Sequence, residues 1–155
     1  MNMKKILSLA AVVGLSLTLL TGCVTNGNTS NNVAAEHALI TLAASTGTEI
    51  DLQNRPQDAI YFVGAEQALG TLGTGTDQIT ASTVQSALND AGVTNPIVAS
   101  AITEAISLGN TFIVNSAGTN APAALVATKA VCVDISTGIH QGLVLSGRAT
   151  VHKSK

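Results

Sequence analysis

The 155-residue sequence contains few aromatic residues and no tryptophan. Its three aromatic side chains are Tyr61, Phe62 and Phe112. A core without large rings must be built from alanine, valine, isoleucine and leucine. These side chains bury less apolar area than aromatic ones, and buried apolar area sets the driving force for folding. We therefore expect a modest core, which a partner or a second copy of the chain could complete.

Charged residues are also scarce, at 10% of the chain, with seven basic and nine acidic side chains. Lys4 and Lys5 lie in an N-terminal segment that we expect to be removed. Without these two lysines the chain has five basic and nine acidic residues, which gives a net charge of about −4. Because phosphate binding needs clustered lysine and arginine, this balance argues against nucleic acid as a partner.

Sequence motifs for catalysis or metal binding are missing. The histidines, His37, His140 and His152, are not at metal-ligand spacing, and the sequence has no HExxH, paired-cysteine, GxSxG or phosphate-loop motif. Glu36 and His37 are adjacent, so on a helix their side chains diverge by about 100°, and we expect both to face solvent. A serine triad leaves no local motif because its members are distant in the chain. We predict a protein that is not an enzyme and has no cofactor and no metal.

The first 23 residues have the order of a secretory signal. Lys4 and Lys5 precede an apolar run, 6–20, that contains no charge, and Leu20-Thr21-Gly22-Cys23 closes it. The run is shorter than the roughly 20 residues that a membrane-spanning helix needs. The alternative is an uncleaved transmembrane anchor, but no flanking charge follows the run.

The cysteine at the expected cut site makes this segment resemble the lipobox of bacterial lipoproteins. The resemblance implies that residues 1–22 are a signal peptide and that Cys23 becomes the N-terminus of the mature chain. It also implies that Cys23 carries lipid on its sulfur and an acyl chain, such as palmitate, on its amine. Val24 follows Cys23. In such proteins an aspartate at this position tends to retain the protein in the inner membrane, so its absence favours the outer membrane, facing the periplasm.

The rest of the chain is expected to form one domain behind a tether. Residues 23–32 are predicted to be the lipidated N-terminus and a flexible polar tether. Residues 33–143 are predicted to form an all-α domain, a small bundle of about four to five short helices. Residues 144–155 are predicted to be a basic C-terminal tail.

Capping signals divide the domain into helices. The first is expected from Asn32 to Gly47, followed by a loop or extended link over 48–55. The second begins at Pro56 and is stopped by the glycines of 70–75. Thr80 is placed to cap the third helix, and Gly92 has the position of a left-handed C-cap.

Asn95-Pro96 opens the fourth helix, which is clearly amphipathic as far as Ile113. Its predicted apolar face comprises Val98, Ala101, Ile102, Ala105, Gly109, Phe112 and Ile113. A loop is expected over 115–121.

A fifth helix is predicted from Pro122 to Leu143. Its apolar stripe comprises Leu125, Thr128, Val131, Cys132, Ile135, Ile139 and Leu143. The alternative for 131–135 is a strand, because this segment is rich in β-branched residues. Gly138 and Gly142, four residues apart, would let a neighbouring helix approach closely. With Cys23 lipidated, Cys132 has no intramolecular partner. It is either buried as a small hydrophobic residue or bridged to another chain.

Residues 35–42 and 65–72 are identical at six of eight positions. This similarity could reflect a duplicated helix pair about a pseudo-twofold axis. The alternative is chance, because alanine- and leucine-rich amphipathic helices resemble one another, and two copies fall short of a repeat array.

The layout as a whole loosely resembles small alanine-rich helical lipoproteins of bacterial genomes, some of them associated with prophages. The preferred hypothesis is a lipid-anchored envelope protein with a structural or protein-interaction role, which binds an envelope protein or self-associates. One alternative is a phage- or mobile-element-type lipoprotein that interferes with a receptor or entry machinery. A second alternative is an envelope hydrolase or its accessory subunit.

Overall fold

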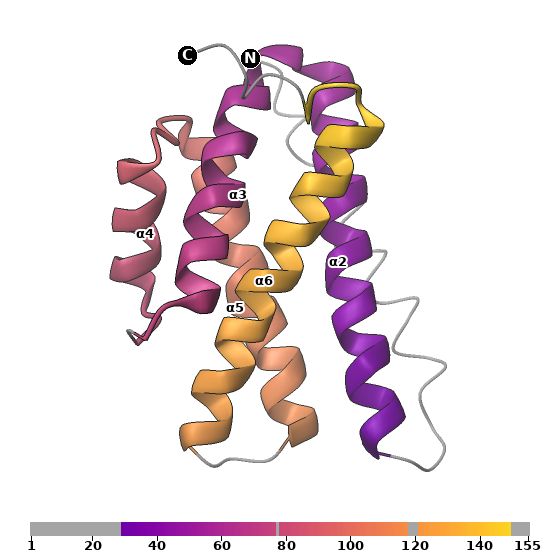
Figure 1. Ribbon diagram of the computed structural model, residues 1–155, viewed down its shortest axis with the longest axis vertical. Coiled ribbons are helices and arrows are strands. Elements are labelled where there is room, and N and C mark those ends of the chain that lie inside the picture. Colours follow the sequence, from indigo (N-terminus) through magenta and orange to yellow (C-terminus); the bar gives the residue numbers. More distant parts are fainter. Residues whose placement is uncertain (1–28, 77, 118–120, 150–155) are drawn as a thin grey trace.

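The computed structural model describes residues 29–76, 78–117 and 121–149, with side chains over 34–76, 78–111 and 125–149. The described residues form α2 (Thr29–Asn54), the 3-10 helix η2 (Pro56–Asp58), α3 (Ala59–Thr74), α4 (Ala81–Asp90), α5 (Pro96–Ala117) and α6 (Ala121–Leu145) (Figure 1). No strand occurs in these ranges, so the all-α prediction is confirmed. The predictions for 1–22 and for Cys23 fall outside them. No helix in these ranges is long and apolar enough to cross a membrane.

Helix α6 is the centre of the bundle. It packs against α2, α3 and α5, while α4 lies at the edge against α3 and α5 (Figure 1). Five residues of its predicted stripe are at most 2% exposed: Val131, Cys132, Ile135, Ile139 and Leu143. The helix prediction for 131–135 is therefore confirmed, and the alternative of a strand is wrong.

Helices α2 and α6 approach each other through glycine, as predicted from Gly138 and Gly142. A Cβ atom at Gly138 would collide with the carbonyl oxygen of Thr41 and lie 2.6 Å from the Cβ atom of Ala44. One at Gly142 would lie 2.7 Å from the carbonyl oxygen of Ser45. Later residues of α6 thus meet later residues of α2, so the two helices run in the same direction.

Helix α4 has the caps that its sequence predicts. The Thr80 hydroxyl accepts a hydrogen bond from the Thr83 N–H at 3.2 Å, and the Thr83 hydroxyl accepts one from the Thr80 N–H at 2.7 Å. At the other end Gly92 has a φ of 78°. The Val93 N–H donates to the Leu88 carbonyl at 2.9 Å, which closes a Schellman motif.

The predicted end of the first helix is wrong. Helix α2 begins at Thr29, which shortens the predicted tether, and it passes through Gly47 to Asn54. A glycine in a helix interior costs about 1 kcal/mol relative to alanine. Continuing the helix buries Thr48, 3% exposed, and Leu52, 2% exposed, and this burial outweighs the cost.

The glycines of 70–75 do not stop α3 where predicted. Gly70 and Gly73 lie inside the helix, which ends at Thr74 with Gly75 as its C-cap. A Cβ atom at Gly73 would lie 2.5 Å from Cγ2 of Val133. Gly73 therefore serves the close contact between α3 and α6 and does not break the helix.

The ends of two further helices and one helix face differ from prediction. Helix α5 continues to Ala117 and α6 to Leu145, so the loop expected over 115–121 is shorter and the predicted tail begins as helix. Residues 150–155 of that tail lie outside the described ranges. On α5, Ala101 is exposed, whereas Ile106 is 5% exposed and belongs to the core.

The similar segments 35–42 and 65–72 both lie on helices packed against α6. Helix α2 runs parallel to α6, whereas α3 runs antiparallel to it. The antiparallel order follows because Gly70 lies near Ser136 and Gly73 lies near Val133. The structure therefore does not repeat one helix–helix contact.

Candidate functional site

A buried cluster of charged side chains joins the end of α2, η2 and the start of α5. We call Asp51, Arg55, Asp58 and Asn95 the acidic junction. Asp51 and Asp58 are 4% and 3% exposed. The Arg55 guanidinium contacts Asp51 through Nη2, and its Nε lies 3.5 Å from Oδ2 of Asp58. One guanidinium therefore contacts two buried carboxyl groups.

Asn95 links this cluster to α5. Its Oδ1 accepts a hydrogen bond from the Ile97 N–H at 3.0 Å, which caps the helix, and its Nδ2 donates to Oδ1 of Asp58 at 3.2 Å. Burial raises the pKa of Asp51, since a charged carboxylate loses its hydration there. Arg55 lowers that pKa in part, and Asp58 raises it further.

Two histidine–carboxylate pairs connect α6 to its neighbours. Nδ1 of His37 on α2 contacts Oδ2 of Asp134, and Nδ1 of His140 lies 3.0 Å from Oε1 of Glu66 on α3. The prediction that Glu36 and His37 face solvent is wrong. Glu36 is 6% exposed, and the His37 side chain is 29% exposed and paired.

The two pairs differ in how exposed their side chains are. The Asp134 side chain is 17% exposed, and burial raises its pKa against the opposing effect of His37. The His140 side chain is 57% exposed, so its pair with Glu66 lies in water and contributes little to stability. A carboxylate that holds one ring nitrogen orients an imidazole for proton exchange at the other. The two histidines contact opposite neighbours of α6 and do not form one site.

Cys132 lies on the buried face of α6 and is 0% exposed. Burial raises the pKa of its thiol to about 11. The thiolate is the reactive form, so a thiol in this environment is a poor nucleophile at neutral pH. The structure confirms the buried alternative for Cys132.

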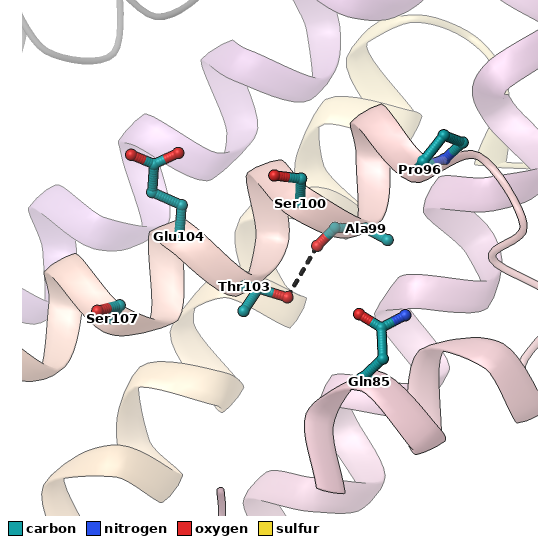
Figure 2. Close-up of a pocket in the computed structure, with 7 residues that line it drawn as sticks. All are labelled: Gln85, Pro96, Ala99, Ser100, Thr103, Glu104 and Ser107. Atoms are coloured by element: carbon teal, nitrogen blue, oxygen red, sulfur yellow. Dashed lines mark hydrogen bonds between the residues drawn. The ribbon is translucent and has the colours of Figure 1, made fainter. Parts of the chain in front are cut away.

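A shallow groove of about 480 Å³ lies between α4 and α5 (Figure 2). Gln85 comes from α4, and the other lining residues, Pro96, Ala99, Ser100, Thr103, Glu104 and Ser107, come from α5. The Thr103 hydroxyl donates to the Ala99 carbonyl at 2.9 Å within the helix, which leaves it less free for a ligand. The lining holds one carboxylate and no histidine, so it offers no acid–base pair.

Within the described ranges no group of three or more histidine, cysteine or carboxylate side chains is arranged to hold a metal ion. Comparison with protein-family models, with curated proteins and with solved structures found no match for this chain. The predicted lipidation site, Cys23, precedes the described residues.

The acidic junction is the feature that sequence reasoning missed. Asp51, Arg55 and Asp58 are spaced four and three apart, which is the spacing of ion pairs on one helical face. That signal was present in the sequence. The prediction of a loop over 48–55 conceals it, because spacing along a loop does not place side chains on one face.

Proposed function

We propose that this protein is a lipid-anchored protein of the bacterial envelope whose helical domain has a structural or protein-interaction role. The observation that carries the proposal is the order of Lys4-Lys5, an apolar run and Leu20-Thr21-Gly22-Cys23 at the N-terminus. Lipid on Cys23 holds the chain to one leaflet, and two or more acyl chains make the attachment stable. We place the protein at the outer membrane, facing the periplasm.

The short distance along the chain between Cys23 and α2 limits how far the domain can lie from the membrane. Helix α2 begins at Thr29. Even fully extended, the chain between them spans only about 20 Å. The start of α2 would therefore lie near the membrane, and the acidic junction is at the other end of this helix.

An apolar stripe on the outer face of α6 supports the interaction role. Val126 and Val144 are 68% and 52% exposed, and Val133, whose Cγ2 lies beside Gly73 of α3, is 39% exposed. At about 100° per residue, their directions around the helix axis agree within roughly 20°. Apolar residues gathered on one exposed face are typical of surfaces that bind another protein. This outer stripe of α6 is the surface on which we expect a partner.

Metabolic labelling with an alkyne-bearing fatty acid tests the anchor. The wild-type chain should take up label and fractionate with membranes, whereas Cys23→Ser should remain unlabelled and unprocessed. Cys132→Ala, which removes the other cysteine, is the matched control and should label like the wild type. Equal labelling of wild type and Cys23→Ser would refute the proposal.

A photo-crosslinking amino acid introduced in living cells tests the interaction role. Placed at Val133 or Val126, it should give a discrete adduct with an envelope protein or with a second copy of the chain. Placed at the exposed Gln85 on α4, it should not. An adduct with a receptor or entry protein would favour the interference alternative. Absence of adducts at both α6 positions would contradict an interaction through this stripe.

A further inference from the structure

The acidic junction has an uneven balance of charge. Two carboxyl groups, Asp51 and Asp58, face one guanidinium, Arg55. Both carboxyl groups are more than nine-tenths buried. With both ionised, the cluster would hold one negative charge without a counter-charge, and an uncompensated buried charge is costly unless it is neutralised.

The carboxyl oxygens of the junction also outnumber the hydrogen-bond donors that reach them. Asp58 Oδ1 accepts from Asn95, and Asp51 Oδ1 is engaged by Arg55. The second oxygen of each group, Oδ2, is buried and has no hydrogen-bond partner among the described residues, and Oδ2 of Asp58 has only the Arg55 Nε ion-pair contact at 3.5 Å. The two carboxyl groups are neighbours, because both contact the guanidinium of Arg55. A proton on one of the two oxygens would supply a donor, and the other carboxyl group would accept.

We propose that the Asp51 carboxyl group keeps its proton in the folded protein and faces Asp58 as acceptor, which makes the junction of α2, η2 and α5 sensitive to pH. The charged side chains that act on Asp51 are Arg55, which lies between α2 and η2, and Asp58, on η2. Asn95, before α5, is neutral and contacts Asp58. With one proton bound to the pair, a single carboxylate remains ionised, and the positive charge of the guanidinium balances its negative charge.

The direction of the effect follows from linkage. The pKa of Asp51 is raised above its ordinary value of 3.8, so the folded chain keeps a proton that the unfolded chain has lost. The contribution of this group to stability is then fully present below about pH 4 and is lost as pH rises through the raised pKa of the folded state. Within that window the unfolding equilibrium constant should increase by up to about tenfold per pH unit, which is the limit for one proton.

The test compares thermal unfolding of the full chain in detergent, from about pH 4 to pH 8, among four chains. The wild type should lose stability across the window. Asp51→Asn and Asp58→Asn should each flatten the slope, because either amide removes the excess carboxyl group. Asp90→Asn, an exposed aspartate at the end of α4, should keep the wild-type slope. The histidines are unchanged in all four chains, so the difference between slopes isolates the junction.

Carboxyl-carbon NMR of the wild-type chain provides a readout that does not depend on how the variants fold. One aspartate signal should titrate well above the ordinary range, and it should be absent in Asp51→Asn or Asp58→Asn. The amide of Ile97, bonded to Asn95, should exchange faster with rising pH after correction for the intrinsic rate. If every aspartate carboxyl titrates near 3.8, or if the Asn variants keep the wild-type slope, the proposal is overturned.

Discussion

The middle of α2 and its C-terminal end are held in different ways. In the middle, Thr41, Ala44 and Ser45 fit against Gly138 and Gly142 of α6, with backbone close to backbone. At the end, Asp51 and Arg55 belong to a buried cluster of charges. Contacts of the first kind depend on shape and are indifferent to pH. Contacts of the second kind depend on protonation. We call the packing of α2 on Gly138 and Gly142 the fixed contact, and the acidic junction the adjustable contact.

The largest expected effect is on the fixed contact. Gly138→Leu should destabilise the protein by about 3 kcal/mol, because its side chain would enter space held by the Thr41 carbonyl and the Ala44 side chain. Backbone atoms cannot give way as a flexible side chain does, so α2 and α6 must separate. Thermal or denaturant unfolding measures the loss.

Gly47→Ala is the matched control for this prediction. Gly47 is also a helical glycine of the same helix pair, but a Cβ atom there would meet nothing within 4 Å. Alanine should therefore stabilise α2 by about 0.5–1 kcal/mol through helix propensity alone. Equal effects of the two substitutions would mean that α2 and α6 are not packed through Gly138.

The next largest effect is expected at the adjustable contact. Arg55→Met should cost about 2 kcal/mol at neutral pH, because it leaves two buried carboxyl groups without their cation. This loss of stability is smaller than for a fully buried pair, since the Arg55 side chain is 32% exposed and its charge is partly screened by water. Arg148→Met, which removes a cation near the end of α6, should change stability much less.

The pairing at the junction can be isolated with a double variant. Arg55→Met should cost less in an Asp51→Asn background than in the wild type, because the ion pair between Arg55 and Asp51 is already lost there. Unfolding free energies of the four chains give the coupling directly. Additive effects would show that Arg55 and Asp51 act independently.

The smallest effect is expected at Cys132, where burial involves neither charge nor backbone contact. Cys132→Ala should cost about 1 kcal/mol through lost packing, and Cys132→Ser more, because it buries a hydroxyl group. In a Cys23→Ser chain Cys132 is the sole thiol. Maleimide should modify it slowly in the folded state and rapidly in denaturant. Rapid labelling of the folded chain would contradict its place in the core.

Helices α4 and α2 show why some boundaries could be predicted and others could not. The ends of α4 are set by Thr80 and Gly92, whose effects come from hydrogen bonds and backbone geometry within a few residues. Gly47 carried the same kind of local signal, yet α2 continues past it. The residues that decide this, Thr48 and Leu52, are buried by tertiary packing. Local signals predict a boundary only where no packing energy opposes them.

The sequence by itself determined the helical class, the caps of α4, the buried stripe of α6 with Cys132, and the close contact at Gly138 and Gly142. These features follow from periodicity and from backbone chemistry within one or two turns. Tertiary structure alone decided that Asp51 and Asp58 are buried beside one guanidinium and that Asp134 meets His37, 97 residues away. The distinction is physical, because the free energy of a charge depends on the dielectric and the partners around it, and these are set only when distant helices meet.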